Sequence, residues 1–217
     1  MAEAAVERLR EAIIMGELTP GTPLRLEDLA RSLGMSISPI REAVRQLEAL
    51  GLAVHVPHLG AKVVALDVEE LRDLFAVRLV LESHALRAAA ARFGPDDEET
   101  ARRHLALAYE ARDDGDVREA LRAHTDFHFA LYTASGSPWL VRLIRPAWDS
   151  SERFRPALFS LRGELQERHR QLDGELLAAC AAHDPETAAR TLREHLGLAD
   201  EYYAPELGDR GIFERQG

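Results

Sequence analysis

The sequence predicts a mostly α-helical protein with an N-terminal winged helix-turn-helix and a C-terminal all-helical antiparallel bundle. Within residues 26–66, two short amphipathic helices are followed by a segment in which apolar residues recur at every second position. From residue 67 to about residue 204 the apolar spacing is helical throughout, with breaks at Gly, Ser and Pro. The 217 residues are enough for two modest domains, each with its own core.

The N-terminal module, residues 1–66, begins with a helix expected over about residues 2–15 and a loop that turns at Pro20-Gly21. The next helix should end at Gly34, which can adopt the left-handed conformation found after helix ends. A third helix is expected to begin at Ser38-Pro39, because Ser38 can accept a bond from a free amide and proline fits the first helical position.

After the third helix the apolar period falls from 3.6 to 2, which predicts a wing of two strands. Val54 and Val56 precede a turn at residues 57–60, and Val63, Val64 and Leu66 follow it in the second strand. The module therefore has the order helix, helix, helix, hairpin.

Several side chains at the start of the third helix point away from its apolar stripe. An α-helix fits the major groove of DNA, and hydroxyls, helix amide groups and guanidinium groups can hold phosphates or read base edges. We therefore expect this helix to bind DNA; a three-helix packing unit with no ligand is the alternative. The outward-facing residues are Ser36, Ile37, Ser38, Arg41 and Arg45.

The net charge of −10 argues against a protein that coats nucleic acid indiscriminately. Residues 1–66 hold seven Arg and Lys against eight acids, so the module carries −1 and the remainder −9. Among these basic residues Arg25 is a further candidate for DNA binding. Non-specific affinity for DNA should be weak, and tight binding would need a dimer and a particular sequence.

Residues 67–204 are expected to form a bundle of six or seven helices. Asp67 and Glu70 form a capping box for a long helix that reaches about residue 92. Asp116 caps a later helix that runs to Ala134. The other helices begin at Gly94-Pro95 and after Ser137, and two long ones cover about 161–182 and 185–203; residues 205–217 are expected to form a flexible tail.

Three of the bundle helices place polar residues where the pattern calls for apolar ones. Buried imidazoles and carboxylates need partners, and a divalent metal would satisfy several of them together. His124 and His128 are four residues apart on one helix face, a spacing that suits two metal ligands. The candidate ligands are His124, His128, Asp173 and His195, with His169 as an alternative ligand or outer partner. Satisfied core histidines are the alternative interpretation.

Arg78 also lies on the inward stripe of its helix, where a guanidinium must meet an anion. Glu82, one turn further on, is one possible partner. A bound carboxylate is the other, because the planar guanidinium matches it with two parallel hydrogen bonds. Arg78 is therefore the candidate effector-binding residue.

Taken together, these motifs resemble the GntR family of bacterial transcription regulators, specifically its FadR-like branch with a helical ligand domain called FCD. The resemblance covers residues 6 to about 200. It is most specific in IIMGELTPGTPL and in LEDLARSLGMSISPIREAVRQLEALGL, and looser but continuous in LFAVRLVLESHAL, DFHFALYTASGSPWL and DGELLAACAAHDPETAARTLREHL.

The resemblance implies a homodimer that binds palindromic operator DNA through its N-terminal domains. It further implies that the helical domain binds a small organic acid beside a divalent metal, of the zinc, nickel or manganese kind. By the same resemblance Ser36, Ser38, Pro39 and Arg41 face DNA, with Gly60 at the wing tip.

Three positions depart from the family pattern. Ile37 stands where many members carry Arg, which leaves the operator sequence open. His124 stands at the usual metal Asp and Asp173 at a usual His, so two ligands are exchanged while the charge of the set is unchanged. Ser137 replaces a frequent Asn after Ser-Gly.

The sequence and its resemblance to the GntR family thus predict a metabolite-responsive, sequence-specific transcription regulator that acts as a repressor and is not an enzyme. A regulator that senses metal alone, a metalloenzyme built in the bundle, and a purely structural metal are the alternatives. The absence of long apolar runs and the single Cys180, expected in the core, favour a cytoplasmic protein without a membrane partner.

Overall fold

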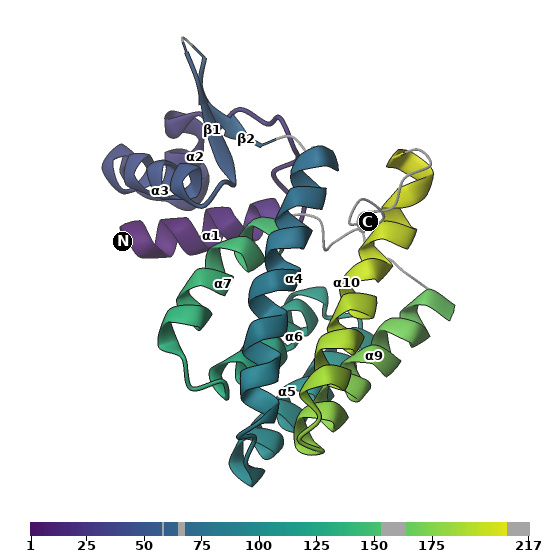
Figure 1. Cartoon of the computed structure of the whole chain (residues 1–217). Coiled ribbons are helices and arrows are strands. Elements are labelled where there is room, and N and C mark those ends of the chain that lie inside the picture. Colours follow the sequence, from purple (N-terminus) through teal and green to yellow (C-terminus); the bar gives the residue numbers. More distant parts are fainter. Residues whose placement is uncertain (58, 65–67, 153–163, 208–217) are drawn as a thin grey trace. The chain divides into compact units, whose positions relative to one another are not determined.

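A computed structural model describes residues 1–57, 59–64, 68–152 and 164–207. They form helices and one small sheet, as predicted (Figure 1). The chain divides into two compact units: the first comprises Met1–Leu71 with a segment that begins at Trp148, and the second comprises Arg72–Ala147 with the C-terminal helices. Within the described part of the chain, no helix is long and apolar enough to cross a membrane.

The described part of the first unit contains three complete helices and a hairpin. Its elements are α1 (Ala2–Ile14), α2 (Leu26–Leu33), α3 (Ile37–Ala49), β1 (Ala53–Val56) and β2 (Gly60–Val63). The two strands pair antiparallel with Ala53 opposite Val63, and in Figure 1 they project away from the three helices. The apolar stripes of the helices meet in a core built around Leu9, Ile40 and Leu47.

Gly34 ends α2 with a φ of 64°, the left-handed conformation that was predicted. The start of α3 differs from the prediction, because the residue preceding the helix is Ser36 rather than Ser38, and Ser38-Pro39 lie inside the first turn. Proline is tolerated there because the first-turn amides have no partner within the helix.

The segment that begins at Trp148 joins the first unit through polar contacts. Arg10 donates to Asp149 at 2.7 Å, and the Ser150 hydroxyl donates to the Leu50 carbonyl at 2.9 Å. Both contacts link residues about a hundred or more positions apart, and helical periodicity alone gives no indication of them.

Among the described residues, the second unit contains six helices, two of which lie partly in the first unit. They are α4 (Val68–Ala90), α5 (Pro95–Asp113), α6 (Val117–Thr133), α7 (Pro138–Ser151), α9 (Glu164–Ala181) and α10 (Pro185–Leu207). Helix α5 packs on α6 and α9, and α9 packs on α10. Asp116 caps α6 by accepting the Glu119 amide at 3.0 Å, as predicted.

Two of the expected helix ends lie near the limits of the described residues. The capping box of Asp67 lies outside the described residues, since Asp67 is not among them. Helix α10 extends to Leu207, past Pro205, where the tail was expected to begin. Proline fixes φ near the helical value and lacks only its own amide, so it removes one hydrogen bond of the helix while the next residues can keep the helical conformation.

Candidate functional site

The start of α3 presents the outward-facing surface that was expected to meet DNA. Ser36, Ile37, Ser38, Arg41 and Arg45 are exposed, while Ile40, Ala43 and Val44 of the same helix are buried. All of these exposed residues except Ile37 line a shallow hollow. Its other lining residues are Pro39, Glu42, Met1 and Ala2.

Two further candidates lie outside that hollow. Arg25 is exposed just before α2, and Gly60 is exposed at the wing turn with a φ of 83°. A side chain at this φ would be strained, so glycine suits the turn. The surface formed by the start of α3, Arg25 and the wing can supply both point charges for phosphates and a helix for the groove.

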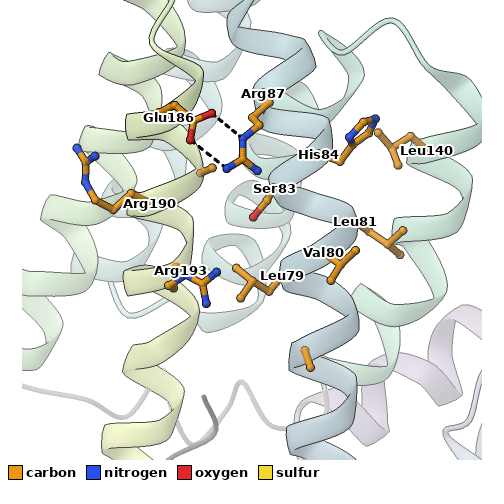
Figure 2. A pocket seen from close by; sticks show the side chains of 12 residues that line it. Leu79, Val80, Leu81, Ser83, His84, Arg87, Leu140, Glu186, Arg190 and Arg193 are labelled. Atoms are coloured by element: carbon orange, nitrogen blue, oxygen red, sulfur yellow. Dashed lines mark hydrogen bonds and ion pairs between the residues drawn. The ribbon is translucent and has the colours of Figure 1, made fainter. Parts of the chain in front are cut away.

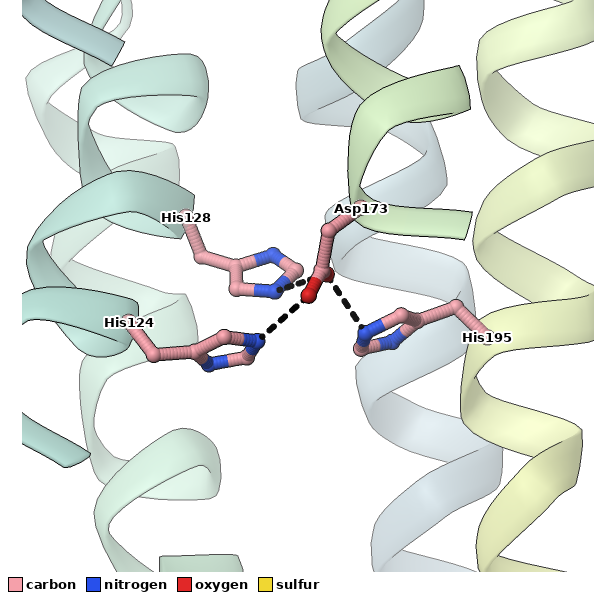
Figure 3. A group of neighbouring side chains, drawn as sticks. All are labelled: His124, His128, Asp173 and His195. Carbon is pink, nitrogen blue, oxygen red and sulfur yellow. Dashed lines mark hydrogen bonds and ion pairs between the residues drawn. The ribbon is translucent and has the colours of Figure 1, made fainter. Parts of the chain in front are cut away.

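The second unit brings four chemically matched side chains to one interior point. His124 and His128 come from α6, Asp173 from α9 and His195 from α10, and all four are buried (Figure 3). One donor atom from each lies within 4.8 Å of the other three. These are the four residues that the sequence singled out, and the helical spacing explains why two of them come from one face.

Asp173 is the centre of this cluster. Its Oδ1 lies 2.8 Å from His195 Nε2 and 3.5 Å from His128 Nε2, and its Oδ2 lies 3.2 Å from His124 Nε2. Three imidazoles therefore turn a ring nitrogen toward one carboxylate, as Figure 3 shows.

The contacts within the cluster are not all hydrogen bonds. Asp173 Oδ1 and both ring nitrogens of His195 are buried, yet they make no hydrogen bond within the described part of the chain. At 2.8 Å, His195 Nε2 and Asp173 Oδ1 are close but not aligned as donor and acceptor. Lone pairs aimed at a shared point rather than at one another are what a metal ion requires, and three imidazoles with one carboxylate are a typical ligand set.

Electrostatics favours an ionised carboxylate at the centre. Burial by itself raises the pKa of Asp173, but the surrounding imidazoles of His124, His169 and His195 hold that pKa well below its ordinary value. The group is therefore an anion, the form in which a carboxylate binds a metal.

His169 lies beside the cluster rather than within it. Its Nδ1 is 3.3 Å from Asp173 Oδ2, and its side chain is 17% exposed, more than those of the four clustered residues. The geometry places His169 as a neighbour of the carboxylate, on the side that is closer to solvent.

Tyr109 of α5 supports the same carboxylate. Its hydroxyl lies 2.9 Å from Asp173 Oδ2 and 3.0 Å from the Arg170 carbonyl, and it can donate to either. Burial, together with the nearby Asp173 carboxylate, raises the pKa of Tyr109, so the hydroxyl stays protonated as a donor.

Arg78 meets Glu82, one of the two partners that the sequence left open for it. The guanidinium donates from Nε to Oε1 at 2.6 Å and from Nη2 to Oε2 at 3.3 Å. The same carboxylate accepts the Tyr132 hydroxyl at 2.6 Å, and burial and Glu82 raise the pKa of Tyr132 well above its ordinary value. The structure thus shows an internal ion pair with a tyrosine attached.

A surface hollow of about 700 Å³ lies over α4 between α7 and α10. Figure 2 shows Arg87 on α4 bound to Glu186 on α10, at 3.0 Å and 3.2 Å, with Val80 and Leu140 among the apolar lining. Neither Arg78 nor the four-residue cluster lines this hollow.

Comparison with known proteins gives the family. The FCD domain family matches residues 73–198, and the bacterial regulatory proteins of the gntR family match residues 1–63. The chain belongs to the GntR family.

This GntR protein is similar to transcription regulators over most of their length. It is 30% identical over 197 residues to the transcriptional repressor GlaR of Escherichia coli K12, covering 87% of this chain and 89% of GlaR. It is 31% identical to a probable D-xylose utilization operon repressor of Paenarthrobacter nicotinovorans, covering 87% and 84%. The fold matches the solved structure of E. coli McbR with a TM-score of 0.82, 24% identity, and 95% and 98% coverage.

These relatives establish a DNA-binding transcriptional regulator with an N-terminal helix-turn-helix and a helical FCD domain, and not an enzyme. The winged fold, the helical bundle and the family that the sequence predicted are confirmed.

Two tyrosines at or next to the buried cluster were not predicted from the sequence. Tyr132 follows His124 and His128 at the same four-residue spacing, so the stripe itself contained the signal. Tyr109 lies 64 residues from Asp173, and nothing local indicates that the two side chains meet.

Proposed function

We propose that this GntR regulator is a metabolite-responsive repressor whose FCD domain binds a small carboxylate beside a divalent metal. The observation that carries the proposal is the convergence of His124, His128, Asp173 and His195 in a buried cluster whose ligand atoms lie within 4.8 Å of one another. The relatives named as repressors support the direction of control. A regulator of this kind acts in the cytoplasm, where its DNA is.

When bound, the metal would polarise an oxygen of the acid and supply positive charge in the buried interior. Three neutral imidazoles and one carboxylate give the site a charge of −1, so a divalent ion leaves it at +1 and suited to an anion. Imidazole-rich sites favour zinc and nickel, and the carboxylate also suits manganese.

The regulator is proposed to bind palindromic operator DNA as a homodimer, with Ser36, Ser38 and Arg41 at the bases and phosphates. Helix-turn-helix dimers place one reading helix in each of two successive major grooves. The residues proposed to contact DNA are Arg25, Ser36, Ile37, Ser38, Pro39, Arg41, Arg45 and Gly60.

Replacing Arg41 with Ala is expected to weaken binding to a duplex selected from a random pool by the native protein. Each lost contact is worth roughly 1–3 kcal/mol and occurs in both halves of a dimer, so affinity should fall at least about tenfold. Fluorescence anisotropy at several salt concentrations measures this. Arg122→Ala is the matched control, because Arg122 is exposed on α6 and paired with Glu119 and Asp126. Equal affinities for both variants would contradict the proposed reading helix.

The surface of the second unit offers an apolar patch for a second copy. Val77 and Val80 of α4 are 43% and 69% exposed, and Trp139 and Leu143 of α7 are 67% and 56% exposed. Residues of both helices line the hollow in Figure 2. Such exposed apolar residues on adjoining helices are typical of an interface rather than of a monomer surface.

Val80→Asp is expected to convert a dimer of 24.2 kDa chains into monomers in light scattering, because a charge cannot be buried without a partner at such a contact. Val54→Asp is the control, since Val54 is 42% exposed on the wing in the other unit. A native protein that is already monomeric, or a Val80→Asp variant that stays dimeric, would overturn this interface.

The pairing of Arg78 with Glu82 favours a second candidate function, in which the metal alone is the effector. An acid must compete with Glu82 for the Arg78 guanidinium, whereas a metal needs no such exchange. Titrating Zn²⁺ or Ni²⁺ against operator binding in the absence of organic acids separates the two functions. A full response to metal alone identifies a metal sensor, and a response that requires an added acid supports the metabolite-responsive regulator.

A further inference from the structure

A series of buried contacts links the cluster of His124, His128, Asp173 and His195 to α4. Tyr132 donates its hydroxyl proton to Glu82 Oε2 at 2.6 Å, and the hydroxyl oxygen of Tyr132 lies 3.3 Å from His128 Nδ1. Arg78 holds the other side of Glu82 through two N–H groups. Arg78, Glu82, Tyr132 and His128 are each 5% exposed or less, so water does not compete for these bonds.

The direction of these bonds determines where His128 carries its proton. A phenol has one proton, and that of Tyr132 is committed to the carboxylate of Glu82. Toward His128 the phenol oxygen can then only accept, so Nδ1 of the neutral imidazole must be the nitrogen that bears hydrogen. Nε2 is left with its lone pair, and Nε2 is the atom that faces Asp173 within the cluster, at 3.5 Å.

We propose that Arg78, Glu82 and Tyr132 are positioning residues that fix His128 in its metal-binding tautomer and ring orientation. The inference rests on the proposed metal site and adds to it the role of three residues on α4 and α6. Metal-binding histidines donate their second ring N–H to an outer partner, and such partners raise metal affinity. Here that partner is a phenol whose direction is set by a buried ion pair.

Arg78 also has a role that does not depend on an effector. Its guanidinium balances the Glu82 carboxylate, which would otherwise be an uncompensated charge in the interior. With Arg78 in place, Glu82 remains ionised and accepts the Tyr132 hydroxyl proton. The Tyr132 oxygen can then accept the Nδ1 hydrogen of His128.

The test compares native protein with Tyr132→Phe, which removes only the hydroxyl. Co²⁺ is the probe, because its visible absorption reports the geometry of nitrogen and oxygen ligands, and affinity is measured by chelator competition. We expect Tyr132→Phe to bind Co²⁺ about 10–100-fold more weakly than native protein, with altered absorption bands. Glu82→Gln, which keeps the shape but not the charge, should shift affinity in the same direction.

A direct measurement of the tautomer does not require metal. Long-range ¹H–¹⁵N correlation spectra of the metal-free native protein should show His128 protonated on Nδ1, and Tyr132→Phe should lose this preference. The control is Ser151→Ala, which removes the buried bond from the Ser151 hydroxyl to the Trp148 carbonyl without touching the cluster. It should lower thermal stability but leave Co²⁺ affinity and spectrum unchanged.

The outcomes of these experiments distinguish the positioning role of Tyr132 from the metal site itself. Native protein that fails to bind Co²⁺ would remove the metal site itself. Native protein that binds Co²⁺, with Tyr132→Phe showing the same affinity, spectrum and tautomer, would leave the metal site standing and overturn the positioning role.

Discussion

Asp173→Asn is expected to abolish tight binding of a divalent metal by the FCD domain. Asp173 is the one carboxylate among the four clustered residues, and it is fully buried at their centre. The amide has the same shape but no charge, so the site would offer only neutral ligands. Loss of an outer partner already costs about 10–100-fold in affinity, and loss of the central ligand should cost more.

Metal content after purification and chelator competition measure this effect. The matched control is Asp126→Asn, since Asp126 is an exposed carboxylate on α6 whose partner is Arg122 at 3.0 Å. Added metal should raise the melting temperature of the native protein and of the control but not of Asp173→Asn, because only a ligand of the folded state stabilises it. Equal metal content in all three proteins would show that the cluster is not the metal site.

The cluster could be predicted because its members lie on regular helices. Helical spacing fixes which face a residue occupies, and an inward face must supply partners for any polar group on it. His124 and His128 on α6 were therefore visible as a pair, and Asp173 and His195 each lay on an apolar stripe. His124 and Asp173, the two residues expected to be exchanged relative to the family pattern, both lie in the cluster.

Periodicity could not decide between partners that lie within the same interior. Glu82 and a bound acid were both chemically suitable for Arg78, and only the three-dimensional structure shows the ion pair at 2.6 Å. The contact of Tyr109 with Asp173 could not be predicted, because the partner of a hydroxyl depends on which helices are neighbours. Sequence spacing does not give that information.

The predicted start of α3 was wrong for a local reason. Ser36 and Ser38 are both suitable residues for the start of a helix, and Pro39 is tolerated at either of the resulting positions in the first turn. The helix began at the earlier serine, so the residues that were expected to precede α3 form part of its exposed first turn. This shift leaves Ser38 and Arg41 on the outward-facing surface.

The effector response is expected to depend on the planar fork of Arg78. A carboxylate that binds the metal-loaded native protein should raise its melting temperature, by an amount equivalent to about 2.7 kcal/mol at a hundred times its dissociation constant. A panel of citrate, succinate and malonate, each with and without a chelator, identifies the acid. The shift should disappear with the chelator, because the proposed acid binds beside the metal.

Arg78→Lys then separates recognition of the acid from support of the metal. Lysine keeps a positive charge near Glu82 but cannot form two parallel bonds to a carboxylate. Cobalt affinity should therefore fall much less than in Tyr132→Phe, while the thermal shift from the acid is lost. Leu79→Ala on the same helix is the control for packing, since Leu79 is buried and apolar. If Arg78→Lys kept the full shift, Arg78 would act only through Glu82 and Tyr132, and the acid would be held by other groups.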